Sequence, residues 1–282
     1  MSSAPAPVVA TGARPAAAEP LIRFRGVGLT LAGHEILRGI DLDIHRGEFV
    51  CVVGPSGCGK TTTLRLIAGL MQPSTGSVTF EGRPVAAPRA DVAIIFQDYA
   101  KALLPWRTVA GNVSLALESL GVPKRDRAPR IAALLAKVGL KGQEKRYPNQ
   151  LSGGMQQRLQ IARCLAQNPS VLLMDEPFGA LDAMTRQALQ DEVLGIVASS
   201  GATVFFVTHD LEEAVYLGDR VIGLLPRPGR VGQVVGVDLP RPRDQLATRE
   251  APDFLRLRRR LFDFIRAAEA ESEGHAEDQA EA

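Results

Sequence analysis

Two kinds of hydrophobic pattern alternate along most of the chain. Short continuous apolar runs are typical of strands that are buried on both faces of a parallel sheet. They occur at residues 49–53, 92–96, 171–174, 203–207 and 221–225. Longer segments with apolar residues every three or four positions predict helices at 62–68, 109–120, 125–138, 154–167 and 184–197. Because strands alternate with helices, we predict an α/β core with a mainly parallel sheet and right-handed crossovers.

Two regions depart from this alternation. Near the start, residues 40–44 alternate apolar and polar side chains, which is typical of a half-buried antiparallel strand, and a short strand is expected at 78–80. Between about 99 and 165 the helical segments follow one another without a strand. We therefore predict an N-terminal antiparallel β subdomain and an inserted α-helical subdomain beside the parallel core.

The two ends of the chain differ from the core in composition. Residues 1–20 are rich in Ala and Pro, without a basic start or a sustained apolar stretch, and so predict a disordered tail rather than a secretory signal. A helical extension is expected at 241–268, where arginines interleave with Leu and Phe. The basic face of this helix is expected to contact either a membrane surface or solvent. The acidic residues that follow it in the chain favour solvent. Residues 269–282 hold almost no large apolar side chain and predict a second disordered tail.

Composition and charge narrow the class of protein. The chain of 282 residues is 45% hydrophobic and 23% charged, which are ordinary values for globular proteins. A net charge of +2 is too small to argue for a nucleic acid partner. Cys51, Cys58 and Cys164 form no C-x-x-C pair, which argues against a disulfide framework or a zinc site. No stretch approaches the roughly 18 consecutive apolar residues of a membrane-spanning helix. These features favour the reducing cytosol as the location of the protein.

The segment GPSGCGKT at 54–61 fits the phosphate-loop pattern G-x-x-x-x-G-K-[ST] and follows the apolar run at 49–53. Glycines let backbone N–H groups approach an anion, and a helix starting near Gly59 directs the positive end of its dipole to the same place. Lys60 supplies a positive charge for the β- and γ-phosphates, and the Thr61 hydroxyl can bind Mg²⁺. An accidental Gly-rich turn is the alternative, but the strand–loop–helix context favours a nucleotide phosphate site.

Two further segments carry chemistry that such a site needs. The run at 171–174 ends in Asp175 and Glu176. In phosphate-loop hydrolases the first acid holds Mg²⁺, and the second can orient or deprotonate the attacking water. A surface turn is the alternative. Ser152 is a good N-cap, and the two glycines after it leave the first N–H groups of the next helix exposed, which predicts a second anion-binding helix start. We expect it to reach the γ-phosphate held by another copy of the chain.

The motifs stand in one order along the chain. They are the phosphate loop at 54–61, Gln97, the signature segment at 151–157, the acids and proline at 175–177, and the segments 180–182 and 208–210. This order, which covers about residues 21–237, resembles that of the nucleotide-binding subunit of an ATP-binding cassette (ABC) transporter. The resemblance implies an α/β fold with a RecA-like phosphate-loop core in a domain at 21–240. It also implies a head-to-tail dimer, in which each ATP lies between one subunit's phosphate loop and the other's signature segment.

The resemblance implies a role for each matching residue. The residues that would form the ATP site are Gly54, Pro55, Ser56, Gly57, Cys58, Gly59, Lys60, Thr61 and Thr62, together with Ser152 and Gly154, which would act on the opposite subunit's ATP, and Asp182, which would couple the two sites. Those that would hold Mg²⁺ are Thr61, Gln97 and Asp175. Those that would act in catalysis are Glu176 as the base, His209 at the γ-phosphate, and Gln97 at the attacking water.

One stretch departs from the family. An aromatic residue usually stacks on adenine shortly before the phosphate loop, whereas residues 29–34 contain no Tyr, Phe or Trp. Leu31 or His34 is expected to contact the base instead. We therefore predict modest discrimination, with less than about a hundredfold preference for ATP over GTP, or roughly 2.7 kcal/mol.

The segments 96–109 and 225–231 resemble importers of nitrate, aliphatic sulfonates and taurine. The implied function is a Mg²⁺-dependent ATPase subunit that dimerises around ATP and powers import of a small solute through a separate membrane permease. An extracytoplasmic solute-binding protein would deliver the solute. The subunit would lie peripherally on the cytoplasmic face of the cell (inner) membrane. An apolar cluster after Gln97 is expected to dock a permease helix, unless its Trp packs into the helical insertion. Its residues are Tyr99, Leu103, Leu104 and Trp106.

Two other classes compete with this interpretation. One is a soluble ABC-type ATPase acting on nucleic acid or ribosomes, and the other is a phosphate-loop kinase or GTPase. The chain has no long coiled-coil insert, second cassette or basic face, which argues against the first. The signature segment and His209 argue against both. The sequence does not identify the solute, because such a subunit does not touch it.

Overall fold

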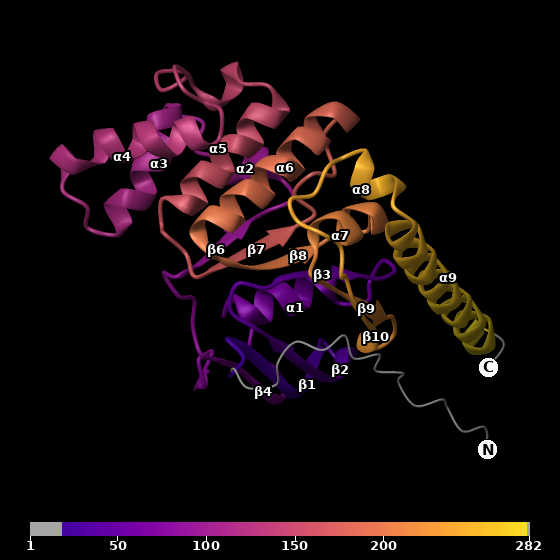
Figure 1. Ribbon diagram of the computed structural model, residues 1–282. Helices are drawn as coiled ribbons and strands as arrows, with labels where there is room; N and C mark the ends of the chain where they lie inside the picture. The colour runs from indigo at the N-terminus through magenta and orange to yellow at the C-terminus, as the bar shows by residue number, and fades with distance from the viewer. Residues whose placement is uncertain (1–18, 281–282) are drawn as a thin grey trace. The chain divides into compact units, whose positions relative to one another are not determined.

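The computed structural model describes residues 19–280, without the side chains of 99–100 and 272–280. The described chain divides into two compact units, and Figure 1 labels most of their elements. The first unit comprises the chain up to Pro88 and from Phe205 onward, and the second comprises Arg89–Val204. Apart from Glu19 and Pro20, the predicted N-terminal tail lies outside the described residues.

The first unit begins with an antiparallel sheet in the order β2-β1-β4-β5. Its strands are β1 (Ile22–Leu31), β2 (His34–Ile44), β4 (Thr75–Phe80) and β5 (Arg83–Pro84). This confirms the predicted antiparallel β subdomain. The pairing register of β1 with β2 shifts between Phe24 and Val27, around Gly26 with its φ of +54°. Such a bulge interrupts the alternation of apolar and polar residues, which is why the pattern did not predict β1.

A parallel pair of strands forms the middle of the first unit. The wholly buried β3 (Phe49–Val53) runs parallel to β9 (Arg220–Leu225), and β10 (Arg230–Gly236) pairs antiparallel with β9 at the edge. The end of β8 (Thr203–Val207) lies on the other side of β3. Two short helices follow these strands: α1 (Lys60–Ile67) comes after β3 and the phosphate loop, and α7 (Leu211–Leu217) comes after β8.

The C-terminal part of the first unit is helical. Its helices are α8 (Ala247–Glu250) and α9 (Pro252–Ala280). Phe254, Leu261 and Ala268 recur every seven residues and are buried, so one stripe of α9 packs against the unit. The helix continues through Ala280, although the sequence predicts disorder from 269. The segment is rich in Ala and Glu, which are strong helix formers.

The second unit pairs two parallel strands with a group of helices. β6 (Val92–Ile95) runs parallel to β7 (Val171–Asp175), as predicted for the α/β core. Between these strands in the chain lie α2 (Tyr99–Ala102), α3 (Val109–Ser119), α4 (Lys124–Lys137), the 3-10 helix η1 (Pro148–Gln150) and α5 (Gly153–Leu165). The helix α6 (Ala183–Ser200) follows β7. Within the described chain, no helix has both the length and the apolar character that crossing a membrane requires.

Candidate nucleotide site

The phosphate loop needs glycine for its conformation and for space. Gly57 and Gly59 have φ angles of +77° and +89°, in the left-handed region that favours glycine. A Cβ added at Gly59 would collide with the Cδ2 atom of Leu37. One added at Gly54 would lie 2.6 Å from both the Leu224 carbonyl oxygen and the Cys58 sulfur. At both ends of the loop, neighbouring atoms therefore leave no room for a side chain.

Lys60 begins α1 and folds back over the loop. Its Nζ donates hydrogen bonds to the carbonyl oxygens of Gly54 at 2.7 Å and Pro55 at 3.0 Å. The Cys58 sulfur lies 3.9 Å from the same nitrogen. Burial raises the pKa of the Cys58 thiol, and the Lys60 charge opposes part of this rise. The ammonium group is thus held at the loop that the sequence predicts to bind phosphates.

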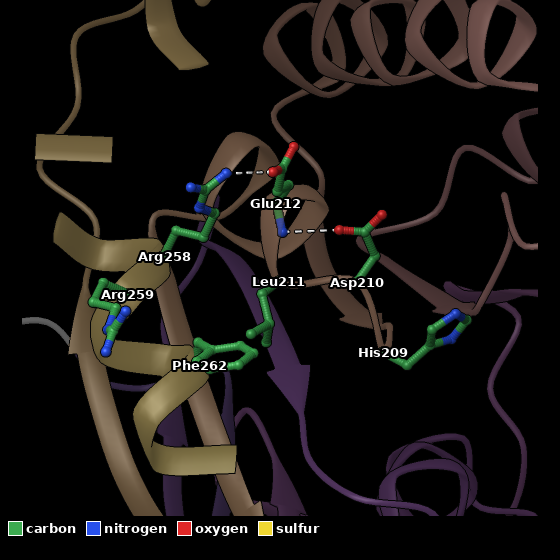
Figure 2. Close-up of a pocket in the computed structure, with 7 residues that line it drawn as sticks. All are labelled: His209, Asp210, Leu211, Glu212, Arg258, Arg259 and Phe262. Carbon is green, nitrogen blue, oxygen red and sulfur yellow. Dashed lines mark hydrogen bonds and ion pairs between the residues drawn. The ribbon is translucent and has the colours of Figure 1, made fainter. Parts of the chain in front are cut away.

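His209 lies where β8 meets α7, and Figure 2 shows it beside Asp210. The residues around it fix the backbone on both sides. The Thr208 N–H donates to the Val52 carbonyl on β3 at 3.1 Å, and the Thr208 hydroxyl donates to Glu213 at 2.8 Å. The imidazole itself is exposed. The histidine is therefore tied through its neighbour to β3, the strand that leads into the phosphate loop.

In the second unit, the structure brings Gln97 and Glu176 together. The Gln97 Nε2 donates to the Glu176 Oε2 at 3.3 Å, at the ends of β6 and β7. Glu176 has a φ of +45°, a rare conformation for a residue other than glycine. Strain of this kind persists where surrounding structure enforces it and is common at functional sites. Asp175 directly precedes this residue, so the predicted acids lie beside the predicted glutamine.

The signature segment meets the start of α6 at Thr185. Ser152 caps α5, because its hydroxyl accepts a hydrogen bond from the Met155 N–H at 3.3 Å. A Cβ added at Gly154 would lie 2.6 Å from the Thr185 methyl carbon. Asp182 caps α6 by accepting from the Thr185 N–H at 3.0 Å, and this backbone hydrogen bond lowers the pKa of Asp182. Gly154 and Asp182, predicted to act across a dimer, therefore contact the same threonine.

The residues expected to hold Mg²⁺ supply suitable atoms. Thr61 belongs to the first unit, and Gln97 and Asp175 belong to the second. Their hydroxyl, amide and carboxylate oxygens are the hard donors that Mg²⁺ prefers. Each of the three residues therefore supplies an oxygen atom of the kind that this ion binds.

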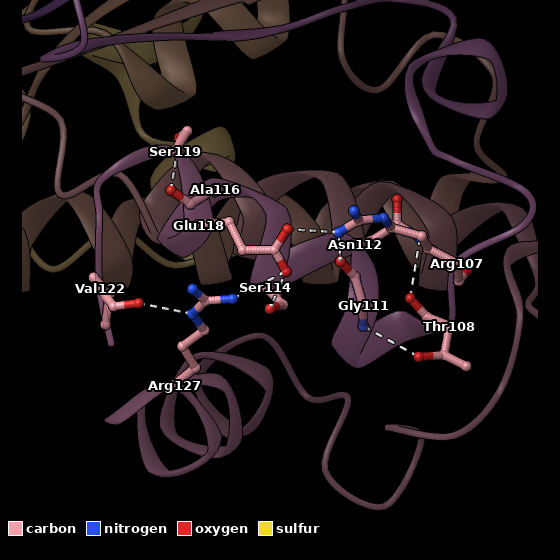
Figure 3. A network of polar contacts seen from close by, with 10 residues as sticks. All are labelled: Arg107, Thr108, Gly111, Asn112, Ser114, Ala116, Glu118, Ser119, Val122 and Arg127. Carbon is pink, nitrogen blue, oxygen red and sulfur yellow. Dashed lines mark hydrogen bonds and ion pairs between the residues drawn. The ribbon is translucent and has the colours of Figure 1, made fainter. Parts of the chain in front are cut away.

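Sequence reasoning missed Asn112, which organises the loop before α3 (Figure 3). Its side chain is fully buried. Its Nδ2 donates to the carbonyl oxygens of Leu104, Arg107 and Thr108, each at 3.1 Å, and its Oδ1 accepts from the Leu104 N–H at 2.9 Å. The sequence signal that could have revealed Asn112 is its position, as a polar residue, within the apolar stripe of the helix predicted at 109–120. Asn112 thereby fixes the loop that contains Trp106.

The structure divides the predicted apolar cluster. Trp106 is 71% exposed, whereas Leu103 is only 2% exposed and packs into the core of its unit. Leu104 is half-buried, and the side chain of Tyr99 lies outside the described residues. The prediction that Leu103 lies on the surface is therefore wrong, because Leu103 belongs to the buried apolar side of its segment. Leu31 and His34, the expected contacts of the base, are both exposed.

The parallel strands, the phosphate loop after β3 and the acids after β7 define a phosphate-loop α/β nucleotide hydrolase. A model of the ABC transporter family matches residues 37–179. The chain belongs to this family and is an ABC-type ATPase that binds ATP. This confirms the resemblance inferred from the order of the motifs.

Curated relatives and a solved structure agree with this assignment. A protein named as an aliphatic sulfonates import ATP-binding protein from Burkholderia cenocepacia is 47% identical, over 87% of this chain and 87% of its own length. A nitrate import ATP-binding protein from Synechococcus elongatus is 47% identical over 81% of this chain, which spans only 35% of that relative. The dimeric structure of a bacterial ABC transporter cassette is 33% identical, with a TM-score of 0.67, and covers 77% of this chain and 98% of that one.

Proposed function

We propose that this chain is the ATP-hydrolysing subunit of an importer. Two copies dimerise around ATP and power the passage of a small solute through a separate membrane permease. Nitrate, a sulfonate, taurine or a similar small solute is the cargo. The names of the sulfonate and nitrate import relatives and the dimeric state of the related cassette support this proposal. The subunit works on the cytoplasmic face of the cell (inner) membrane, and an extracytoplasmic solute-binding protein delivers the solute.

The hydrogen bond between Gln97 and Glu176 carries the proposal. It joins the carboxylate best placed to act as general base to the segment that leads directly to Trp106. Hydrolysis and partner contact would therefore be linked within one short stretch of the second unit. Glu176 directly follows Asp175, which is proposed to hold Mg²⁺. From this position the Glu176 carboxylate can accept a proton from the water that attacks the γ-phosphate.

The remaining residues fall into two groups in this proposal. In the first unit, the phosphate-loop amides and Lys60 bind the phosphates, and His209 contacts the γ-phosphate. In the second unit, Ser152 and Gly154 contact the ATP of the partner copy, and Asp182 couples the two sites. Thr61, Gln97 and Asp175 would hold Mg²⁺. When bound, Mg²⁺ neutralises charge on the β- and γ-phosphates.

The catalytic part is tested with Glu176→Gln in the full chain. This change keeps the size of the side chain and one oxygen that can accept from Gln97, but it removes the base. We expect kcat for ATP hydrolysis to fall about a hundredfold to ten-thousandfold, the usual range for a general base. ATP binding should persist, and a dimer should accumulate in size-exclusion chromatography with ATP. Asp126→Asn is the matched control, because this exposed carboxylate of α4 pairs with neighbouring Arg125 at 3.7 Å. Normal turnover in Glu176→Gln would eliminate the proposed base.

The transport part is tested at Trp106. A tryptophan that is 71% exposed on a loop fixed by buried Asn112 offers a rigid apolar contact for a permease helix. We expect Trp106→Ala with Leu104→Ala to weaken assembly with the permease and to reduce transport, while basal ATPase activity is kept. Leu120→Ala, which changes another exposed apolar residue of the second unit, serves as control. Intact assembly and transport would contradict docking at this loop, and stimulation of ATPase activity by DNA or ribosomes would contradict the importer itself.

A further inference from the structure

The helix α7 begins two residues after His209, and arginines of the C-terminal segment (residues 241–280) hold its last turn. Arg243 donates to the carbonyl oxygens of Val215 at 2.9 Å and Gly218 at 2.8 Å, and also to that of Tyr216. Burial lowers the pKa of Arg243 to about 10, so its guanidinium stays charged at neutral pH. A cation at the carbonyl end of a helix is favourable, because those oxygens carry partial negative charge.

Arginines of the same segment also hold the first turn of α7, at Glu212. Arg249 on α8 donates to one Glu212 oxygen at 2.8 Å, and Arg258 on α9 donates to the other at 2.7 Å. Asp210, the residue after His209, accepts from the Glu212 N–H at 2.8 Å (Figure 2). The carboxylate that receives both arginines thus lies three residues from His209, within a single capped turn.

Of the two arginines that contact Glu212, Arg249 is the more enclosed. Its side chain is 18% exposed, against 45% for Arg258. Its guanidinium carbon lies 4.8 Å from the ring centroid of Tyr216 on α7 and 6.0 Å from that of Phe254 on α9. An ion pair combined with stacking on aromatic rings needs the planar guanidinium, which lysine lacks. Arg249 therefore joins α7 to α9 through one charged contact and two aromatic contacts.

We propose that Arg249 is a positioning residue for ATP hydrolysis, which acts through Glu212 and α7 on His209. The inference rests on the proposed function, in which His209 contacts the γ-phosphate. The backbone that carries the exposed His209 is held at Thr208 and Asp210, and it is continuous with the turn that Arg249 holds. A shift of about 1 Å in a reacting group can lower a rate about a hundredfold, so a small movement of this turn is sufficient. The C-terminal segment thereby becomes part of the machinery that sets turnover.

The test compares Arg249→Met, Arg249→Lys and Glu212→Gln in the full chain. Met keeps the length and apolar packing of the side chain but removes its charge. We expect Arg249→Met to lower kcat about tenfold or more and to change KM for ATP less than about twofold. Arg249→Lys should fall between this variant and the parent. Glu212→Gln should lower kcat similarly. The double variant should lose less than the product of the two single losses, because both changes break the contact between Arg249 and Glu212, although Glu212→Gln also alters the contact with Arg258. Arg256→Met is the control, since that side chain is 75% exposed and pairs with Asp253 on its own helix.

Two kinetic outcomes overturn the inference, as does one outcome of hydrogen exchange. One is a normal kcat in Arg249→Met while His209→Ala is inactive. The other is a lower melting temperature of Arg249→Met with kcat unchanged at temperatures where the protein is folded, which would show a structural role only. A failure of the proposed function is different, because His209→Ala would then keep the parent kcat. Amide hydrogen exchange at residues 211–213 provides a readout independent of His209. Faster exchange in Arg249→Met supports the hold on α7, and unchanged exchange there overturns it.

Discussion

The helices α1 and α5 both begin where the sequence predicts an anion, but their first turns are built differently. α1 starts after Gly59, which has no side chain and a φ of +89°. α5 starts after Ser152, whose hydroxyl accepts from the Met155 N–H. Side chains also cap other helices of the described chain, as Asp182 caps α6. The phosphate-loop helix therefore presents its first amides without competition from a cap, whereas the signature helix is capped within its own chain.

The difference extends to what surrounds each turn. The α1 loop is fixed by backbone conformation and by Lys60, which bonds to carbonyl oxygens of the loop itself. The α5 turn is fixed by a side chain of another helix, Thr185 of α6, which packs against Gly154. A cradle built from backbone torsions tolerates few substitutions, whereas a turn supported by one methyl group can be altered and restored. We infer that a substitution in the phosphate loop cannot be compensated by a second change, whereas a substitution at Gly154 can be compensated at Thr185.

The largest expected effect is at Gly59. Gly59→Ala adds a Cβ to a left-handed residue and drives it into Leu37. The conformation alone costs about 1–2 kcal/mol. We expect affinity for ATP to fall about a hundredfold or more, as measured by equilibrium binding of a fluorescent ATP analogue.

Gly57→Ala is the matched control for this change. Gly57 has a similar φ of +77°, but an added Cβ would meet no described atom within 4 Å. It should lose affinity by about tenfold, the part due to conformation alone. Equal losses in the two variants would show that the collision with Leu37 contributes nothing.

The next effect is at Gly154. Gly154→Ala places a methyl 2.6 Å from the Thr185 Cγ2, so the Thr185 side chain, the signature turn or the start of α6 must shift. We expect kcat to fall about tenfold or more while the affinity of the phosphate loop for ATP stays unchanged, because the two starts belong to different units. Steady-state ATPase assays and nucleotide binding to the monomer separate the two quantities.

Thr185→Ser supplies the rescue for this variant. Serine lacks the methyl group but keeps the backbone N–H that Asp182 accepts. The double variant Gly154→Ala with Thr185→Ser should recover most of the lost rate. Without recovery, the contact with Thr185 is not the reason why residue 154 must be glycine.

A smaller effect is expected at Ser152. Ser152→Ala removes the cap of α5, and such a loss costs about 1 kcal/mol of folding free energy. Thr108→Ala removes the equivalent cap of α3, where the hydroxyl accepts from the Gly111 N–H at 3.1 Å. Denaturant unfolding should show similar losses in both variants. Only Ser152→Ala should also lower the ATPase rate, since Ser152 is proposed to contact the partner's ATP. An equal ATPase rate in the two variants would show that Ser152 acts only as a helix cap.

The sequence predicted the parts that depend on local pattern. The apolar runs at 49–53 and 203–207 match the bounds of β3 and β8, and the helix starts near Gly59 and Gly154 follow from glycine and capping residues. Contacts between distant segments were not predictable in the same way. Nothing in the local pattern places Thr185 against Gly154 or Arg249 against Glu212. Such pairs depend on how helices pack, which a single sequence does not specify.

The smallest effect concerns the reactivity of two cysteines, one in each unit. Cys58 lies in the phosphate loop, and Cys164 lies on α5. Burial raises the pKa of both thiols, and that of Cys164 rises to about 12. Only the thiolate is a strong nucleophile, so at neutral pH both should react more slowly with iodoacetamide than free cysteine does. Because a raised pKa keeps the thiol protonated, labelling should accelerate as pH rises, and Cys58 should be labelled before Cys164.

Peptide mapping by mass spectrometry after timed labelling measures this order. ATP should protect Cys58 and leave the rate at Cys164 unchanged, because only the first thiol lies in the loop that binds phosphates. Cys58→Ser should retain ATPase activity within about twofold and abolish the ATP-protected labelling, since the Lys60 contacts with Gly54 and Pro55 do not involve the sulfur. Labelling of Cys164 as fast as Cys58 would mean that the last turn of α5, where Cys164 lies, opens as readily as the phosphate loop. The two units would then not differ in how readily their buried thiols become accessible.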